Sequence, residues 1–400
     1  MNNTINRLII IGNGFDLAHG MKTRYKDFVN EYLEQRMKNP QIDKDDKLIP
    51  FIPHYVADLY DDKLTPVQNL NEIDRSKCKI KRSLFFDTII KEIETKNWVD
   101  IEYSYYEYLR DICNKPELSE KIDELNEEMK CITSELAKYL RKQDAEYENT
   151  NDAEMILEII RPLRSQEMAV SAEKYWNEFV VQRKQREQEE KKKFGYSYNL
   201  HYSSLKYKSD DGTDVYKLYP EKVFLLSFNY TRYIESKFSN ILPTMLVNAF
   251  DGDQIVHHIH GDLKDENSII FGYGDDSDEM YKKLLDKNDN RFLENDKTVK
   301  YLGSARYRNF FGFIESAPFQ VCIMGHSCGI SDRTLLSTIF QHENCVSIKP
   351  YFYENGDNDD YYEIIKNISR CFDDKKLMRD RVVNKEYCEP LPQPGKNKNR

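Results

Sequence analysis

The stretch RLIIIGNGFDLAHG, Arg7 to Gly20, carries the clearest indication of the fold class. Its apolar run, residues 8–11, is short and rich in β-branched residues, which is typical of a strand buried on both faces. The run breaks at Gly12-Asn13-Gly14 and continues into a helical pattern. A strand, a glycine turn and a helix form the opening of a dinucleotide-binding unit, in which a pyrophosphate lies at the helix N-terminus. Leu17 replaces the third glycine of the GxGxxG motif, so the motif is incomplete.

Short apolar runs return about two hundred positions later and alternate with helical patterns. Buried strands separated by helices predict a parallel sheet with both faces covered. The strand at Leu8 has no neighbour before this region, so we expect it to join the later sheet. The predicted fold class is therefore α/β, a Rossmann-type parallel sheet interrupted by a large all-helical insertion. The later runs are VFLLSF (223–228), IVHHIHG (255–261), SIIFGYG (268–274), VCIMGHS (321–327) and CVSIKPYFY (345–353).

The chain of 400 residues is divided into four predicted parts. Residues 1–60 and 216–375 form the two parts of the α/β domain, and residues 61–215 form the helical insertion. Residues 376–400 form a tail, and the Pro-rich, basic stretch that ends it is expected to be disordered. Apolar residues follow a heptad-like rhythm over 117–140, which favours a helical hairpin packed on its own domain over an intermolecular coiled coil.

The composition excludes several classes of protein. The net charge is −10, and Lys and Arg are not densely clustered, so nucleic acid is an unlikely partner. The eight cysteines are scattered without a CxxC pair, which argues against a zinc ribbon and against a disulfide framework. No apolar run approaches the roughly 18 residues of a membrane span. We expect a cytoplasmic protein that binds neither a metal nor a membrane.

Ligands of doubly wound sheets collect at the carboxyl ends of the strands. Each predicted strand of this chain ends in glycine or in polar residues with functional side chains, except the last. Together these strand ends describe a cleft. They are Gly12-Asn13-Gly14-Phe15-Asp16, Asn229-Tyr230-Thr231, His260-Gly261-Asp262, Gly272-Tyr273-Gly274-Asp275 and Gly325-His326-Ser327.

His260 and Asn229 are the candidate catalytic residues. An imidazole with an ordinary pKa near 6.5 suits general-base catalysis, and Gly261 leaves space beside it. Period-two alternation places His258 and His260 on one face. The amide of Asn229 is suited to orienting a water or a sugar hydroxyl. Structural roles remain open for both residues, and Asp16 either caps the first helix or binds a ribose hydroxyl.

The sequence GHSCG, Gly325 to Gly329, also matches the GxSxG elbow of serine hydrolases, with Ser327 as the nucleophile. A strand precedes it and a helix follows. The triad order of those enzymes requires a later histidine. The histidine that follows is His342, on the very next helix and too near in sequence to return, which argues against this alternative.

The motifs IIIGNGFDLAHGMKTRYKDF, LLSFNYT, HIHGD, IIFGYG and GHSCGISD, taken in order, resemble the bacterial abortive-infection AbiH family. That family is in turn similar to sirtuin-like NAD-binding domains. The resemblance covers roughly residues 5–35 and 220–370 and leaves the helical middle unmatched.

The resemblance implies an anti-phage protein that hydrolyses NAD in a sirtuin-like cleft. Catalysis would fall to Asn229 and His260, which match the asparagine and the histidine of the sirtuin pattern. NAD would be held by the strand-end residues, and Thr231 stands where sirtuins have an aspartate that recognises nicotinamide. These NAD-binding candidates are Gly12, Asn13, Gly14, Phe15, Asp16, Thr231, Gly261, Gly325, His326 and Ser327.

Two rival functions remain. In the first, the cleft senses NAD, ADP-ribose or another nucleotide without turnover, and the helical insertion passes the signal to a partner protein. A phage-derived trigger and a homo-oligomer formed through the helical insertion are further expected partners. In the second, the protein is a metal-dependent nuclease that uses Asp357, Asp359 and Asp360, which are more simply a solvated loop.

Overall fold

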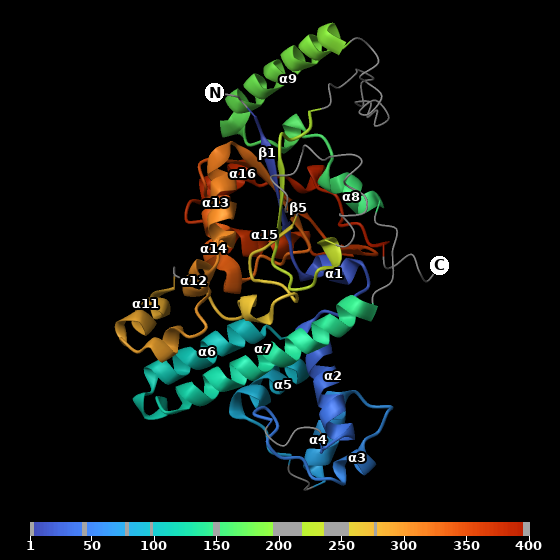
Figure 1. Cartoon of the computed structure of the whole chain (residues 1–400), viewed down its shortest axis with the longest axis vertical. Coiled ribbons are helices and arrows are strands. Elements are labelled where there is room, and N and C mark those ends of the chain that lie inside the picture. The colour runs from blue at the N-terminus through green and yellow to red at the C-terminus, as the bar shows by residue number, and fades with distance from the viewer. Residues whose placement is uncertain are drawn as a thin grey trace.

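The computed structural model describes residues 4–41, 46–76, 80–96, 99–146, 153–194, 218–235, 256–275 and 278–394. Figure 1 shows a sheet between two layers of helices, with a second group of helices, α2–α7, packed against one end of this sandwich. The long helix α9, Glu173–Phe194, projects from the opposite end.

The sheet contains five parallel strands in the order β3-β2-β1-β4-β5. The predicted parallel sheet is therefore confirmed, and the first strand is at its centre, paired with β2 and β4 (Figure 1). The order reverses between β1 and β4, and such a reversal is where open α/β sheets bind ligands. The strands are β1 Asn6–Ile11, β2 Val223–Ser227, β3 Val256–His258, β4 Phe319–Met324 and β5 Cys345–Tyr351.

Helices cover both faces of the sheet, as predicted. Alternate residues of β1 point to opposite sides, so that Leu8 and Ile10 pack in one core while Ile9 and Ile11 pack in another. The first core is closed by α13 Arg306–Ser316, α14 Arg333–Phe340 and α15 Tyr361–Arg370. The second is closed by α1 Asn13–Ala18 and α8 Ala153–Ile159.

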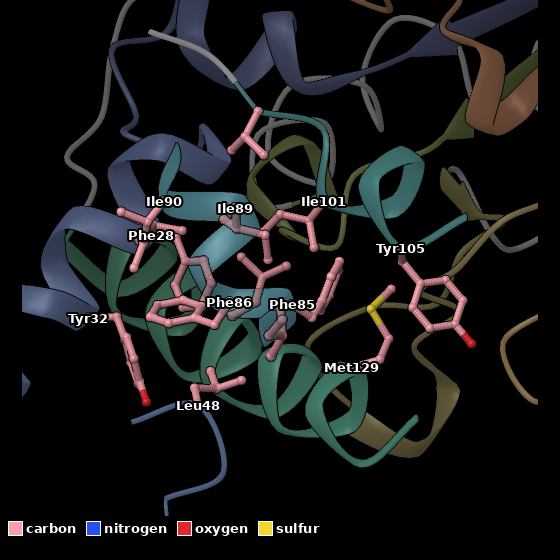
Figure 2. Close-up of a cluster of buried hydrophobic side chains, with 14 of the residues drawn as sticks. Phe28, Tyr32, Leu48, Phe85, Phe86, Ile89, Ile90, Ile101, Tyr105 and Met129 are labelled. Atoms are coloured by element: carbon pink, nitrogen blue, oxygen red, sulfur yellow. The ribbon is translucent and has the colours of Figure 1, made fainter. Parts of the chain in front are cut away.

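The regular structure described between β1 and β2 is entirely helical. Its core is rich in aromatic side chains, and Figure 2 shows Phe28, Phe85 and Phe86 packed among aliphatic residues and Met129. The predicted heptad positions of α7 are buried, which explains the rhythm of that segment. Helix α2 precedes the boundary predicted at residue 60 yet packs into this core, and the boundary predicted at residue 215 lies outside the described residues.

The remaining elements have these bounds. In the helical part they are α2 Tyr25–Lys38, α3 Val56–Leu59, α4 Pro66–Arg75, α5 Leu84–Lys96, α6 Ile101–Asn114 and α7 Lys121–Glu146. In the second part of the chain they are α11 Glu279–Asp286, α12 Lys297–Lys300, the 3-10 turn η8 Tyr301–Gly303, β6 Glu354–Asn355, β7 Asn358–Asp359 and α16 Lys375–Arg381.

Two expectations need correction. Residues 268–274 do not form a strand of the sheet, because the amide of Gly272 donates to the carboxylate of Glu102 on α6 instead of to a neighbouring strand. The start of the Pro-rich tail is ordered. Glu389 forms ion pairs with Arg161 and Lys349, and the amide of the buried Leu391 donates to the carbonyl of Phe352, one residue after β5. Residues 395–400 lie outside the described residues.

The turns that follow β1 and β4 are in direct backbone contact. The amide of Gly14 donates to the carbonyl of Gly325 at 2.7 Å. A Cβ at Gly12 would lie 2.6 Å from His326 Cα, and a Cβ at Gly325 would lie 2.1 Å from the Phe15 amide nitrogen. Gly325 also has a φ of +75°, which side chains disfavour. The glycines of the opening motif therefore allow two loops to approach each other closely.

We predict that Gly325→Ala lowers the free energy of unfolding by about 2–3 kcal/mol, because a left-handed backbone and a backbone clash coincide. Gly312→Ala is the matched control, since Gly312 lies within α13 and a Cβ there meets no atom within 4 Å. That change should raise stability by up to about 1 kcal/mol. Denaturant unfolding measures the stability of both variants. If Gly325→Ala were as stable as Gly312→Ala, the close contact between the two turns would not contribute to the stability of the fold.

Candidate functional site

A largely buried carboxylate, Asp332, with a side chain 11% exposed, lies just before α14 and has three nitrogen-bearing side chains around it. Lys297 Nζ is 2.8 Å from its Oδ1, His260 Nε2 is 3.4 Å from the same oxygen, and His326 Nε2 is 3.4 Å from Oδ2. Asp332 therefore contacts side chains from the ends of β3 and β4 and from the start of α12. The Asp332 cluster denotes Glu102, His260, Lys297, Tyr301, His326 and Asp332.

The two histidines occupy equivalent positions on different strands. His260 stands two residues after β3 and His326 stands two residues after β4. The ring of Phe228, one residue after β2, contacts both imidazoles, with centroid distances of 5.1 Å to His260 and 4.3 Å to His326. The parallel strands thus deliver both side chains to the same edge of the sheet, and an aromatic ring fixes their spacing.

Hydrogen bonds orient the two imidazoles. The amide of Cys328 donates to His326 Nδ1 at 3.0 Å, so we infer that Nε2 carries the proton and points it at Asp332. The Nε2 atom of His260 is 2.9 Å from the hydroxyl of Tyr301, and the two rings are nearly parallel. Tyr301 therefore covers the nitrogen of His260 that faces Asp332.

The helical part of the chain supplies Glu102, which pairs with Lys297. Lys297, at the start of α12, is 1% exposed, and its Nζ lies 3.0 Å from Glu102 Oε1 in the first turn of α6. Glu102 also accepts the Gly272 amide. A buried lysine is tolerated when its charge is paired on both sides, so Lys297 joins the helical part to the α/β domain.

Burial and charge set the protonation of the cluster. Burial, assisted by the positive charge of Lys297, lowers the pKa of His260 to about 3, so this imidazole is neutral at physiological pH. Burial opposes ionisation of Asp332, but Lys297 and the imidazoles outweigh it and hold the pKa of Asp332 well below its usual range. Burial raises the pKa of Glu102 to about 7 despite Lys297. A neutral imidazole beside a carboxylate is the arrangement used in general-base catalysis.

A second polar cluster lies on the other face of the sheet. Thr231 Oγ1 donates to Asp16 Oδ2 at 2.6 Å, and Asn229 Nδ2 donates to the carbonyl of Gly12 at 3.1 Å. The Nδ1 atom of His258 lies 2.9 Å from the carbonyl of Asn229. Asp16 lies in the first turn of α1, where a negative charge complements the helix dipole, but no side-chain capping hydrogen bond is made at this helix N-terminus. The hydrogen bonds of Asn229 and Thr231 therefore connect the residues after β2 to the turn and helix that follow β1.

The predicted catalytic pair is thus divided between two clusters. His260 contacts Tyr301 and Asp332, while Asn229 contacts Gly12. The alternation expected to place His258 beside His260 ends with the strand at His258, because a turn follows in which Gly261 has a φ of +81°. His258 therefore belongs with Asn229.

The other predicted residues have these positions. Gly12 and Gly14 contact the turn of Gly325 and His326, and Asn13 accepts from Thr23 Oγ1. Phe15 is buried against His19, and Gly261 packs closely on the backbone of Ser268. Ser327 is exposed, and its carbonyl accepts from Asn367. The nitrogens of His326 face Asp332 and Cys328, and His342 faces Glu315, so these contacts give no support to the serine-hydrolase alternative.

Sequence reasoning did not select Glu102, Lys297, Tyr301 or Asp332 as site residues. Asp332 had a usable signal, since it follows the GHSCG turn and precedes a predicted helix. Lys297 and Glu102 lie in segments without a motif, and their burial is what distinguishes them.

Within the described residues, no group of three or more His, Cys, Asp or Glu side chains is arranged to hold a metal ion. The aspartates considered for a nuclease lie at the hairpin β6–β7. Asp359 pairs with Lys385, and Asp360 accepts the amide of Tyr353.

The chain matches a known protein family over most of its length. The family described as "Bacteriophage abortive infection AbiH" matches residues 8–353, which include β2 to β5, β1 from Leu8 onward, and both clusters. The chain belongs to the AbiH family. Membership implies a role in abortive infection by phage. No curated protein and no solved structure matches the chain. Among the helices described for this AbiH protein, none has the length and apolarity needed to cross a membrane.

We predict that Lys297→Met lowers the free energy of unfolding by about 3–5 kcal/mol, because it leaves Asp332 and Glu102 buried without their cation. Adding Glu102→Gln should recover at least about 1 kcal/mol, since one of the two orphaned carboxylates is then neutral. Lys282→Met, at an exposed position of α11, is the control and should change stability by less than about 0.5 kcal/mol. Denaturant unfolding measures all three, and a small loss in Lys297→Met would contradict the pairing.

Asp16 generates a prediction about pH. Burial raises its pKa to about 6, although the bond from Thr231 and the charge of His19 oppose the rise. The folded protein therefore holds this proton while the unfolded chain releases it near pH 4, and stability falls as the pH rises from about 4 to 6. Asp16→Asn removes this dependence, so its stability relative to wild type should rise across that window by on the order of 2–3 kcal/mol.

Unfolding measured at several pH values tests this prediction. Other titrating groups are common to both proteins and cancel in the difference. Thr231→Val should extend the window to higher pH, because it removes a hydrogen bond that lowers the pKa of Asp16. A difference between Asp16→Asn and wild type that does not vary with pH would show that Asp16 titrates normally.

Proposed function

We propose that this AbiH protein acts in abortive infection by hydrolysing NAD at the bond between nicotinamide and ribose, with the Asp332 cluster as its catalytic centre. The observation that supports this proposal is the convergence of His260 and His326, from two strand ends, on one buried carboxylate. The cluster lies at the carboxyl edge of the sheet, and His326 borders the reversal between β1 and β4.

The reaction breaks the bond between ribose C1′ and the nicotinamide nitrogen, and the electron pair leaves with nicotinamide. Positive charge then builds on the ribose, where the carboxylate of Asp332 stabilises it. The oxygen of a water forms the new bond to C1′, and His260 takes the proton of that water. The products are nicotinamide, ADP-ribose and one proton, which the imidazole later releases to solvent.

His260 requires a change of surroundings to act as this base. Its pKa is low because the side chain is buried and close to Lys297. Displacement of the Tyr301 hydroxyl by water reduces the cost of charging the imidazole and moves its pKa toward the ordinary value. Asn229 then has a positioning role, since its amide holds the turn after β1 through Gly12.

The pyrophosphate contact proposed for Gly12, Asn13 and Gly14 also requires movement. In the structure, the amide of Gly14 donates to the carbonyl of Gly325, and His326 fills the space beside Gly12. Separation of the two turns would release an amide for the pyrophosphate and uncover His326 in the same step. Thr231 replaces a charged nicotinamide contact with a hydroxyl that Asp16 already engages.

One observation favours a second candidate, a nucleotide sensor without turnover. Asp332 is largely buried, the other members of the cluster are buried, and Lys297 joins Asp332 directly to Glu102 of the helical part. A ligand that disturbs Asp332 would therefore change a contact between the two parts of the chain. Binding of NAD or ADP-ribose without release of nicotinamide would select this candidate.

We predict that the purified protein, alone or with extract from phage-infected cells, releases nicotinamide from NAD. His260→Ala should lower kcat by about 10²–10⁴-fold with little change in KM, because it removes the base and not the binding contacts. Asp332→Asn should lower kcat as well. Chromatography of nicotinamide measures each rate.

His54→Ala is the control, since His54 is exposed and lies between α2 and α3, far in sequence from His260. It should retain the wild-type rate. No release by the wild-type protein under either condition would overturn the hydrolase. Release that His260→Ala does not reduce would place the chemistry away from the Asp332 cluster.

A further inference from the structure

We propose that a groove beside the Asp332 cluster binds the adenylate part of an adenine nucleotide. The groove lies between η8 and the start of α13 and has a volume of about 570 Å³, within the range of about 300–1,000 Å³ typical of small-molecule sites. None of its residues was selected from the sequence. Its lining residues are Tyr301, Leu302, Gly303, Ser304, Ala305, Tyr307, Arg308 and Phe311.

The groove offers flat aromatic surfaces. The rings of Tyr301 and Tyr307 are 5.3 Å apart and nearly parallel, at an angle of 9°. Phe311 lies 4.7 Å from Tyr307. Leu302 adds an apolar side chain that is 80% exposed. Tyr301 is 6% exposed and lies between the rings of His260 and Tyr307, so the partly exposed outer rings, Tyr307 and Phe311, are the ones suited to stacking a planar base.

The charge of the groove selects the kind of base. Arg308 is exposed and is the charged side chain among the lining residues, which include no carboxylate. Arg306, two residues earlier in α13, is not among the lining residues and pairs with Asp262 at 3.5 Å. Such a site favours a neutral ring that carries a phosphate, and it disfavours the cationic pyridinium ring of NAD. The adenylate half fits this chemistry, and the nicotinamide half does not.

Tyr301 connects the groove to the Asp332 cluster. Its ring forms part of the wall, while its hydroxyl lies 2.9 Å from His260 Nε2. A nucleotide stacked on these rings is thus one side chain away from the proposed base. This inference deepens the proposed function and rests on it for the identity of the substrate, since it places the adenylate half in the groove and leaves the other half to reach toward Asp332.

Calorimetry with AMP, adenosine and nicotinamide mononucleotide tests the inference on the full chain at low salt. AMP should bind at least about tenfold more tightly than nicotinamide mononucleotide. Tyr307→Leu should weaken AMP and adenosine by about tenfold or more through lost stacking. Arg308→Gln should weaken AMP by about tenfold and leave adenosine unchanged, because adenosine has no phosphate.

Matched controls exist elsewhere on the surface. Tyr362→Leu and Arg379→Gln change an exposed tyrosine and an exposed arginine away from the groove, and both should bind AMP as wild type does. Thermal unfolding of each variant shows that it is folded; Arg308→Gln alters an exposed side chain, so it tests the site even if Tyr307→Leu is unstable.

Two outcomes would overturn the groove: no binding of AMP at millimolar concentration, or equal binding by wild type, Tyr307→Leu and Arg308→Gln. The proposed function fails separately. AMP binding with the expected sensitivities but without nicotinamide release keeps the groove and removes the hydrolase. Hydrolysis of NAD with a KM that neither variant raises keeps the hydrolase and removes the groove.

Discussion

The ionised state of Asp332 in a buried position is the constraint on which the site depends. Removing a carboxylate from water costs several kcal/mol unless cations or donors surround it. Lys297 and the two imidazoles satisfy this demand, and they come from a helix start and two strand ends that are distant in sequence. The chain must therefore complete its sheet before the carboxylate is neutralised, which links the order of the strands to the chemistry of the site.

The sheet was predictable because its signal is local. The run at residues 8–11 identifies a strand buried on both faces, and the absence of a nearby partner implies pairing with strands much later in the chain. The polar residues after the strands were also informative: Asn13, Asn229, His260 and His326 each stand two residues beyond a strand. The segment SIIF was the wrong prediction, because its apolar residues pack around a backbone that bonds to Glu102 and not to the sheet.

The faces on which these polar residues lie were not predictable in the same way. Alternation fixes side-chain direction only while the backbone is extended. After β3 the chain turns, so His260 faces Asp332 while His258 faces the carbonyl of Asn229. Glu102 and Lys297 escaped prediction for another reason: a charged residue in an ordinary helical or loop segment is normally solvated, and only tertiary packing reveals that these two are buried together.

The packing of the helical part limits how a substrate can reach His260. Its core is continuous with side chains from the α/β domain, including Phe271, Tyr273 and Leu284, and so large an apolar interface opposes hinge motion. Glu102 is therefore a fixed wall of the site and not part of a moving lid. Tyr301 differs, because it lies between His260 and an open groove: its hydroxyl is 2.9 Å from the imidazole, and its ring, which belongs to the core of the α/β domain, stacks on Tyr307. A shift that moves only the hydroxyl from the imidazole, with the ring kept on Tyr307, disturbs fewer contacts than separating two packed bodies, so the groove side is the physically favoured route to His260.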